Sequence, residues 1–431
     1  MSSSPFPAPV SRRNFTRLLA LGATSPWLAP RLLAGAPTAP LGPAGNAPDE
    51  PYWHSVRARF VMPPDISVLN AANLCPSSAP VLESLYECTR SFDRDPSFDN
   101  RAAIAAGKET TRTLLAEFLR VTPEEIILAR NTSEANNMVS LGLDLRKGDE
   151  VVVFGDNHPC NKLAWEKRAE RHGFTVVEIP IIAPHPGAEA YLSALRRTIT
   201  PRTRLIAFSH LTNTVGDLFP ANEICALARA EGILTLVDGA QTFGLLDLDL
   251  GKMSPDFYTG SAHKWPCGPK EAGLLYVNQR AQGRLWPSIV SSGTGAVGIS
   301  ATHEGFGQRD EPALVAFGEA LKFQQSIGRA AIEARSRSLA QALMAGLGEL
   351  DGVELYTDPN PQHSVAVVVF RPGQLDPKAL AHALYRNDRI GCTARTGERP
   401  GLRISPHFYN LPSEIDRTVA AIAKYLKQGL G

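Results

Sequence analysis

Between residues 126 and 237, short unbroken apolar runs alternate with longer stretches of helical periodicity. The runs predict strands at 126–129, 151–154, 176–179, 205–208 and 233–237, and the stretches predict helices at 133–143, 162–172 and 221–231. Strands that are apolar along their whole length are buried on both faces, as in a parallel sheet covered by helices on both sides. The alternation therefore predicts an α/β fold with a mainly parallel sheet flanked by helices.

The pattern changes toward the C-terminus. A helical stretch at 312–350 precedes a strand at 365–370, a helix at 377–387, a strand at 402–405 and a helix at 413–427. These elements predict a smaller α+β domain appended to the first. We expect a large domain over residues 52–310, which includes an N-terminal segment and a helix at 101–119, and a helix with the small C-terminal domain over residues 311–431.

The first 51 residues have the composition of an export signal followed by a linker. The paired Arg12 and Arg13 precede an apolar stretch at 18–29 and a small-residue end at 34–36. This order is typical of a signal peptide, and paired arginines are typical of the twin-arginine type; the alternative is a basic patch on an amphipathic helix. We expect a signal over residues 1–36, a Pro/Gly/Ala-rich linker over residues 37–51, and export of the folded protein to the periplasm by the twin-arginine machinery.

Charge and cysteine content narrow the class of partner. The formal net charge of +1 gives no reason to expect a nucleic acid, or a membrane once the signal is removed. The six cysteines lack the spacing of a zinc site, so we expect no metal and read them as isolated thiols. Pairing of Cys75 with Cys88 stays open in an oxidising compartment.

The central sequence holds an aspartate and a lysine placed for cofactor chemistry. Asp238 directly follows a predicted buried strand, and ligands of open parallel sheets bind beyond the carboxyl ends of strands. A carboxylate there can hold a protonated cofactor ring nitrogen, and the amine of Lys264 can form a Schiff base with pyridoxal phosphate (PLP). Taken singly, an Asp-Gly pair is usually a turn and a lysine is usually a surface charge.

Motifs over much of the chain give these two residues a family context. LVDGAQ (236–241), SAHK (261–264), AGLLYV (272–277) and RISPHFYN (403–410) occur in that order. Between residues 70 and 426 the chain resembles the class V aminotransferases of PLP fold type I, which include isopenicillin N epimerase-like proteins and cysteine desulfurases. The resemblance implies a PLP enzyme, a small-molecule substrate and a homodimer.

The resemblance also implies roles for individual residues. Lys264 would carry the Schiff base, and Asp238 would pair with the pyridine nitrogen. Gln241 would contact the ring hydroxyl oxygen. Four residues would surround the phosphate: Thr132, Ser133, Ser261 and His263. Arg403 and Asn73 would contact the substrate, with Arg403 binding its α-carboxylate. Small hydroxyl residues that open a helix suit a phosphate independently, although residues 131–134 also read as an ordinary helix cap.

Two further assignments depend on local alignment. His158 would stack on the cofactor ring as a third catalytic residue, with Asn161 as the alternative because the alignment needs one inserted residue there. Gln308 stands where many relatives have a threonine that reaches the phosphate of the neighbouring subunit, which puts that contact in question.

The cysteine pattern separates this chain from the desulfurases that it resembles. Their catalytic cysteine lies between an Arg-Thr-Gly element and the carboxylate-binding arginine. Here residues 397–403 contain no cysteine, and Cys392, which precedes the element in an apolar context, is expected to be a buried inert thiol. Sulfur transfer is therefore disfavoured.

The fold does not select among the reactions of PLP, because the cofactor labilises several bonds at Cα. The export signal combined with this core resembles periplasmic PLP proteins that tailor pyoverdine siderophores. We expect a periplasmic enzyme that acts on the amino group of an amino acid or peptide, such as a siderophore side chain, by transamination. The alternatives are an isopenicillin N epimerase-like racemase, a cysteine desulfurase or lyase, and a silent PLP-fold binding protein.

Overall fold

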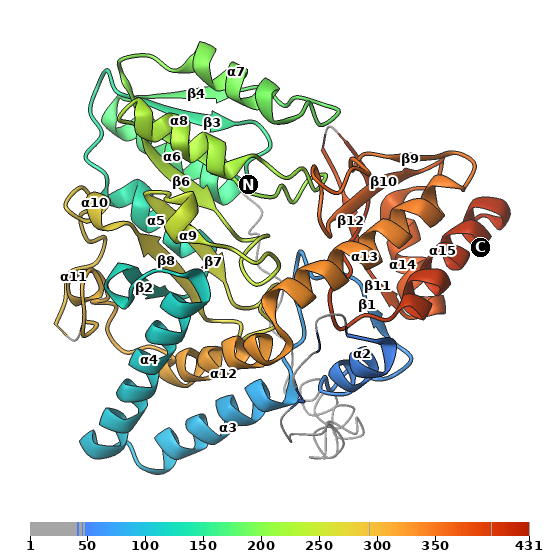
Figure 1. Cartoon of the computed structure of the whole chain (residues 1–431), viewed down its shortest axis with the longest axis horizontal. Helices are drawn as coiled ribbons and strands as arrows, with labels where there is room; N and C mark the ends of the chain where they lie inside the picture. Colours follow the sequence, from blue (N-terminus) through green and yellow to red (C-terminus); the bar gives the residue numbers. More distant parts are fainter. Residues whose placement is uncertain (1–40, 43–44, 46–47, 293, 398, 431) are drawn as a thin grey trace, which may run out of the picture.

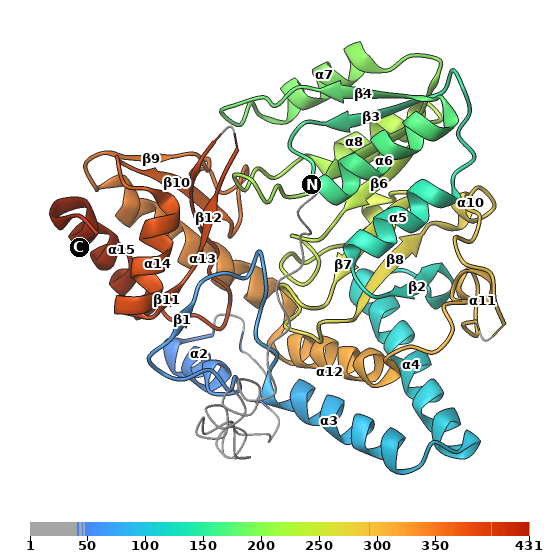
Figure 2. The same cartoon turned by 180° about the vertical axis from the view of Figure 1, so that it is seen from behind.

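The computed structural model describes residues 41–42, 45, 48–292, 294–397 and 399–430. The predicted signal at 1–36 and most of the predicted linker lie outside these residues, so both stay predictions. The described chain forms a large α/β domain and a smaller domain, and the long helix α13 (Arg329–Gly348) runs into the smaller one (Figures 1 and 2).

A seven-stranded sheet forms the centre of the large domain. Its order is β2 (Ile126–Ala129), β8 (Gly273–Val277), β7 (Phe257–Ser261), β6 (Leu234–Asp238), β5 (Thr203–Ser209), β3 (Glu150–Phe154) and β4 (Thr175–Ile179). Only β8 runs antiparallel to its neighbours in this sheet. The predicted α/β fold with a mainly parallel sheet is confirmed.

Alternate residues of each strand enter the hydrophobic cores on the two faces of the sheet. In β3, Val151 and Val153 pack in one core with Trp165 of α6, while Val152 and Phe154 pack in the other. Burying one such side chain contributes about 1.5–3 kcal/mol. The helices of this domain are α3 (Ala79–Arg94), α4 (Phe98–Leu119), α5 (Thr132–Gly142), α6 (Pro159–His172), α7 (Ala188–Thr198) and α8 (Ala221–Ala230), with the short α9 (Leu250–Met253), α10 (Gln279–Gln282), α11 (Ser300–His303) and the 3-10 turn η2 (Pro123–Glu125).

The long helical stretch predicted at 312–350 is two helices. Helix α12 (Glu311–Ile327) ends at Gly328, which has a φ of +94°, and α13 begins at the next residue. A positive φ interrupts the right-handed helix and favours glycine. Helix α12 packs on α3 and α4 in the large domain, whereas α13 packs on α15 in the small one, so the break redirects the chain between domains.

The small domain is an antiparallel sheet covered by helices. Its strand order is β12 (Thr393–Arg395), β13 (Gly401–Ile404), β10 (Val368–Pro372) and β9 (Val353–Leu355), and its other helices are α14 (Pro377–Asp388) and α15 (Pro412–Gln428). No helix among the described residues combines the length and apolar character needed to cross a membrane.

The N-terminal segment contacts both domains, since the Ala72 carbonyl accepts a hydrogen bond from Gln241 of the large domain. Strand β1 (Ser67–Val68), which follows α2 (Glu50–Arg57), pairs with β11 (Ile390–Gly391). The Ala72 amide also donates to Ser405 Oγ at 3.1 Å. The division at residues 52–310 and 311–431 stays a prediction; pairing of β1 with β11 left no local signal in the sequence.

Candidate active site

A cavity of about 380 Å³ lies where strand β6 ends at Asp238 and β7 ends at Ser261. Both domains contribute to its wall. The lining residues are Ala72, Asn73, Asn131, Thr132, Ser133, His158, Cys160, Asn213, Asp238, Ala240, Gln241, Ser261, His263, Lys264, Thr393, Arg395 and Arg403. Every site residue predicted from the sequence lines this cavity except Gln308.

Lys264 and Asp238 meet in this cavity from adjacent strands. Burial lowers the pKa of the Lys264 amine, and the Asp238 carboxylate opposes this shift without cancelling it. A lowered pKa increases the fraction of neutral amine, which is the form that attacks a carbonyl. The Asp238 carboxylate is itself held by the Ala240 amide at 3.0 Å and by Asn136 Nδ2 at 2.9 Å.

Asn136 is a site residue that no sequence motif marks. Its Oδ1 accepts a hydrogen bond from Thr259 Oγ1 at 3.0 Å, so the amide is oriented with Nδ2 toward Asp238. The only sequence signal is spacing, because a residue four positions after Thr132 lies on the same face of a helix.

The first turn of α5 forms the end of the cavity suited to a phosphate. Asn131 caps the helix by accepting from the Glu134 amide at 3.0 Å, and the Thr132 amide donates to Ser261 Oγ at 2.8 Å. The cap and the anion site are therefore one structure. Burial lowers the pKa of His263 to about 4, and its Nδ1 has no hydrogen-bond partner among the described residues.

The structure distinguishes the two residues proposed to face the cofactor ring. His158 lines the cavity, and its Nδ1 accepts from the Cys160 amide at 3.2 Å. Asn161 is fully buried outside the lining, and its Oδ1 accepts from Trp165 Nε1 at 3.2 Å. Burial lowers the pKa of His158, which favours a neutral imidazole. His158 is thus the residue placed to stack.

Gln241 and Arg403 each keep a polar group unused by the protein. Gln241 Nε2 donates to the Ala72 carbonyl at 2.9 Å, which uses one of its two hydrogens, and Gln241 Oε1 accepts from Trp265 Nε1 at 2.8 Å. Arg403 Nη1 donates to the Asn213 carbonyl at 3.1 Å, while its buried Nε has no partner among the described residues. Burial, then the nearby Arg395, lowers the Arg403 pKa to about 10, so the guanidinium stays a cation at neutral pH.

Gln308 lies outside the cavity. Its Oε1 accepts from Arg101 Nη2 at 3.1 Å on the exposed surface. Within one chain, Gln308 lies away from the other site residues. Its contact with the phosphate of a neighbouring subunit stays a prediction. Asn73 lines the cavity with an exposed side chain.

The cysteines are all free in the structure, and Cys75 does not pair with Cys88. Cys392 does not line the cavity, and burial raises its pKa to about 12, as expected for an inert thiol. Cys160 does line the cavity, with its Sγ 3.0 Å from His158 Nδ1, a position that no sequence pattern indicated. Burial, then Asp238, raises the pKa of Cys160, so this group is a thiol at neutral pH.

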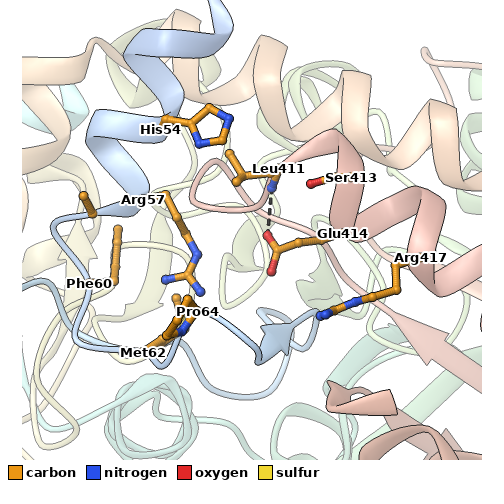
Figure 3. A pocket seen from close by; sticks show the side chains of 10 residues that line it. His54, Arg57, Phe60, Met62, Pro64, Leu411, Ser413, Glu414 and Arg417 are labelled. Atoms are coloured by element: carbon orange, nitrogen blue, oxygen red, sulfur yellow. Dashed lines mark hydrogen bonds between the residues drawn. The ribbon is translucent and has the colours of Figure 1, made fainter.

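A larger hollow of about 450 Å³ lies between α2 and α15 (Figure 3). Its two arginines are already bonded, Arg57 to the carbonyl of Ile66 at 3.3 Å and Arg417 to the carbonyl of Asp65 at 3.3 Å. None of the described residues that line it is a lysine. Size alone therefore does not identify the site.

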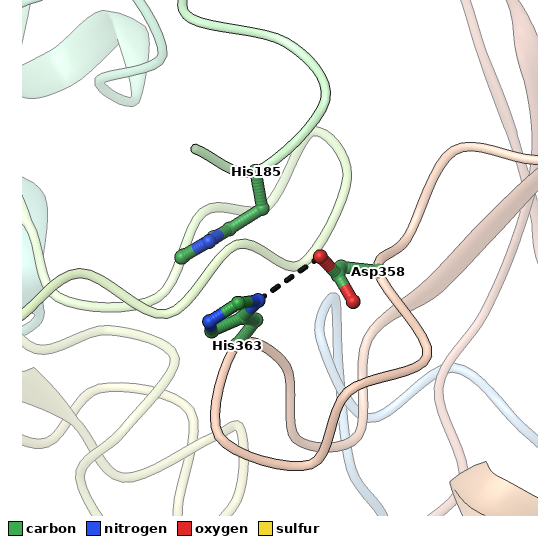
Figure 4. Close-up of side chains that lie close together, drawn as sticks. All are labelled: His185, Asp358 and His363. Carbon is green, nitrogen blue, oxygen red and sulfur yellow. Dashed lines mark hydrogen bonds and ion pairs between the residues drawn. The ribbon is translucent and has the colours of Figure 1, made fainter. Parts of the chain in front are cut away.

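One group of potential metal ligands lies between the domains: His185, Asp358 and His363 (Figure 4). His363 Nδ1 lies 3.0 Å from Asp358 Oδ2, and the His363 ring stacks on His185 with centroids 4.1 Å apart. Both ring nitrogens of His185 are engaged, one with the Gly187 amide and one with the Leu218 carbonyl, each at 3.1 Å. We assign this group to packing between the domains.

The residues of the strand-end cavity fit PLP. A half-buried lysine lines the cavity with an aspartate held by two donors, and a helix N-terminus and an unpartnered imidazole nitrogen belong to the same site. Fold and site together define a PLP-dependent enzyme of fold type I.

Comparison with known proteins agrees with this class. Residues 86–418 match the model of the family described as aminotransferase class-V, and the chain belongs to that family. Isopenicillin N epimerase of Streptomyces clavuligerus is 32% identical over 86% of this chain and 97% of its own length. A probable cysteine desulfurase of Methanothermobacter thermautotrophicus is 28% identical over 80% of this chain and 91% of its own length.

Solved structures show the same fold. A mutant of C-DES with glycine covalently linked to the PLP cofactor superposes with a TM-score of 0.79 at 25% identity, over 85% of this chain and 98% of C-DES. The apo cysteine desulfurase of Thermococcus onnurineus also superposes with a TM-score of 0.79, at 23% identity, over 87% of this chain and 98% of its own. The cofactor of the present protein is accordingly PLP.

Proposed function

We propose that this enzyme breaks the Cα–H bond of an amino acid or peptide that has a free amino group and an α-carboxylate. The observation that carries the proposal is the shared cavity: Lys264 and Arg403 both line it, and the buried Arg403 Nε has no partner among the described residues. When bound, PLP acts as an electron sink for a carbanion at Cα. An arginine fork that binds the carboxylate fixes which bond of Cα is presented.

Lys264 has two roles in this proposal. It would hold the cofactor, and its free amine would serve as a base for the Cα proton. Its lowered pKa suits the second role, because a neutral amine can accept the Cα proton. Asn136 and the Ala240 amide keep the Asp238 carboxylate in place throughout.

Similarity to isopenicillin N epimerases favours epimerisation as the reaction. Two isopenicillin N epimerases, at 32% and 30% identity, match 86% and 87% of the chain. Sulfur transfer is less favoured, although relatives include probable cysteine desulfurases. Residues 397–403 contain no cysteine, and neither Cys392 nor Cys160 is a thiolate at neutral pH. The four-residue set of Asp238, Gln241, His263 and Lys264 also argues against a silent binding protein.

Transamination of an exported peptide, such as a siderophore side chain, is the second candidate. It is supported by the paired Arg12 and Arg13 at the head of a signal-like sequence. Periplasmic location and a homodimer are parts of this proposal.

The test is exchange of the Cα proton in deuterated water with a panel of amino acids and short peptides. Exchange with inversion of configuration supports epimerisation, and exchange with transfer of the amino group to an α-keto acid supports transamination. The Lys264→Ala variant is the control and should show neither. A wild-type protein that exchanges no Cα proton with any amine of the panel would contradict the proposed function.

A further inference from the structure

We infer that Arg395 and Arg403 form a paired anion site, and that the substrate carries a second acidic group besides its α-carboxylate. This inference rests on the proposed function and names its substrate class. Arg403 was predicted from the sequence to bind the α-carboxylate, whereas Arg395 had no assigned role in substrate binding.

The register of β12 and β13 brings the two arginines together. Thr393 is paired with Arg403, and Arg395 is paired with Gly401, in an antiparallel ladder. Residues two apart on a strand share a face, so both arginines project from the same face as diagonal neighbours. Such neighbours are about 7–8 Å apart. Both line the active-site cavity.

The cavity has an excess of positive charge on this side. Among the described residues, its lining contains Lys264, Arg395 and Arg403 but a single carboxylate, Asp238. Asp238 accepts a hydrogen bond from Asn136, and its carboxylate is the group that would pair with the cofactor's ring nitrogen. Among the described residues, neither Arg395 nor Arg403 makes an ion pair.

A third arginine of this region, Arg399, is neutralised by a carboxylate of the protein. Arg399 Nη2 lies 2.8 Å from the buried carboxylate of Asp156, which comes from the large domain. No such carboxylate faces Arg395 or Arg403 within the described part of the chain. Two like charges held in one partly buried cavity repel each other, and burial lowers the pKa of both. Acidic groups of a bound substrate offset this repulsion.

A carboxylate that pairs bidentately with the Arg403 fork presents both of its oxygens to that fork. A guanidinium on the neighbouring strand, about 7–8 Å away along the diagonal, then has no bidentate partner of its own, although each oxygen keeps a second lone pair. A second carboxylate, on a side chain or on a neighbouring residue of a peptide, completes the pair. The substrate class is an amino acid or peptide with two acidic groups.

The experiment measures binding of probes that have no amine. Isothermal titration of the purified holoenzyme compares glutarate and adipate with butyrate and hexanoate. Wild-type protein should bind the dicarboxylates at least about tenfold more tightly, as expected for one added charge-assisted contact. Arg395→Gln should abolish this preference while binding butyrate as before, and Arg403→Gln should weaken every probe.

Three results would overturn the paired site. One is equal wild-type affinity for dicarboxylates and monocarboxylates, and another is an Arg395→Gln variant that weakens both classes equally, which indicates two arginines on one carboxylate. The third concerns Glu398, the only acid between residues 396 and 402, which lies outside the described residues. Glu398→Gln should leave the preference unchanged, and a large gain in affinity there would make Glu398 the natural partner of Arg395.

The probes separate this inference from the proposed function. Dicarboxylate preference without Cα exchange would keep the anion pair and reject the Cα chemistry. Exchange of the Cα proton without a preference for dicarboxylates would keep the proposed Cα chemistry and reject the paired anion site. Arg395→Lys, which keeps the charge, should retain part of the preference, and an unchanged visible cofactor spectrum shows that each variant is folded and loaded.

Discussion

The amide of Asn136 donates a hydrogen bond of 2.9 Å to the carboxylate of Asp238. Thr259 fixes the other end of that amide, so one side chain of α5 orients the aspartate at the end of β6. The carboxylate predicted to pair with the cofactor ring is therefore positioned by a helix whose first turn is the predicted phosphate site.

Asn136→Ala should slow Cα exchange without unfolding the protein. Loss of a hydrogen bond to a charged group costs about 1.5–3 kcal/mol, or about ten- to a hundredfold in rate. Asn137→Ala is the matched control, because the Asn137 amide bonds to the Ser133 carbonyl on the exposed side of the same helix. Asp238→Ala should go further and abolish exchange. Near wild-type rates in both the Asn136 and Asp238 variants would refute the role of this pair.

Lys264→Ala should lose the visible absorbance of covalently bound PLP, since the amine that forms the bond is removed. Lys270→Ala is the control in the same loop, because Lys270 is exposed and bonds to Ser77 Oγ at 3.2 Å. The control should keep its spectrum. An Lys264→Ala protein with the wild-type spectrum would show that another lysine holds the cofactor.

Asp217 should make stability depend on pH. Burial, then Asp156, raises its pKa from 3.8 to about 7, and both carboxylate oxygens lack partners among the described residues. Because the folded state binds this proton more tightly, its contribution to stability is complete below about pH 4 and is lost as the pH rises to about 7. Relative to wild type, Asp217→Asn should gain about 2–3 kcal/mol in free energy of unfolding between pH 5 and pH 8.

Urea denaturation at the two pH values measures this difference. The exposed Asp416→Asn variant is the control and should show no comparable gain. If Asp217→Asn followed the wild-type pH dependence, the carboxyl would not be protonated in the folded protein near neutral pH.

Replacing Arg12 and Arg13 by lysine should leave the precursor in the cytoplasm with its signal attached, because paired arginines address the twin-arginine route. Cell fractionation and the mass of the purified protein measure this. Arg17→Lys is the control, being a nearby arginine outside the pair. Mature protein in the periplasm of the double variant would reject the twin-arginine assignment.

L-Cysteine should yield no protein persulfide and no more sulfide than free PLP releases. The loop before Arg403 provides no thiol, and the pKa values of Cys392 and Cys160 are both raised. Sulfide and alanine are measured together with wild type, Cys392→Ser and Cys160→Ser. Stoichiometric sulfide and alanine, abolished in either variant, would restore the desulfurase reading.

The sequence predicted five of the seven strands of the central sheet, because most of these five are buried and apolar along their length; β7 and β8 were not predicted. The predicted strand at 126–129 coincides with β2, and the run ending at Asp238 corresponds to β6. Helices α3 and α7 were not predicted. The break at Gly328 was also missed, since glycine is tolerated inside a helical pattern and its φ depends on tertiary packing.

The residues of the site likewise divide into those that a sequence motif marks and those that only the fold brings into the cavity. Lys264 and Asp238 could be predicted because each belongs to a short contiguous motif. Asn136, Asn213 and Arg395 could not, because each acquires its role through a contact made by the fold. Gln308 differs again, since its predicted partner lies on another subunit.

The pairing of the N-terminal segment with the small domain has a consequence for synthesis. Ala72 and Ser405, joined by a hydrogen bond, are 333 residues apart in the chain. Residues 67–72 therefore leave the ribosome among the first and find their partners among the last. Until α13 is made, Trp53, which is buried in the finished protein, lacks the Arg335 guanidinium that lies over its ring. Docking of residues 67–72 thus requires that the chain has been translated at least as far as Ser405.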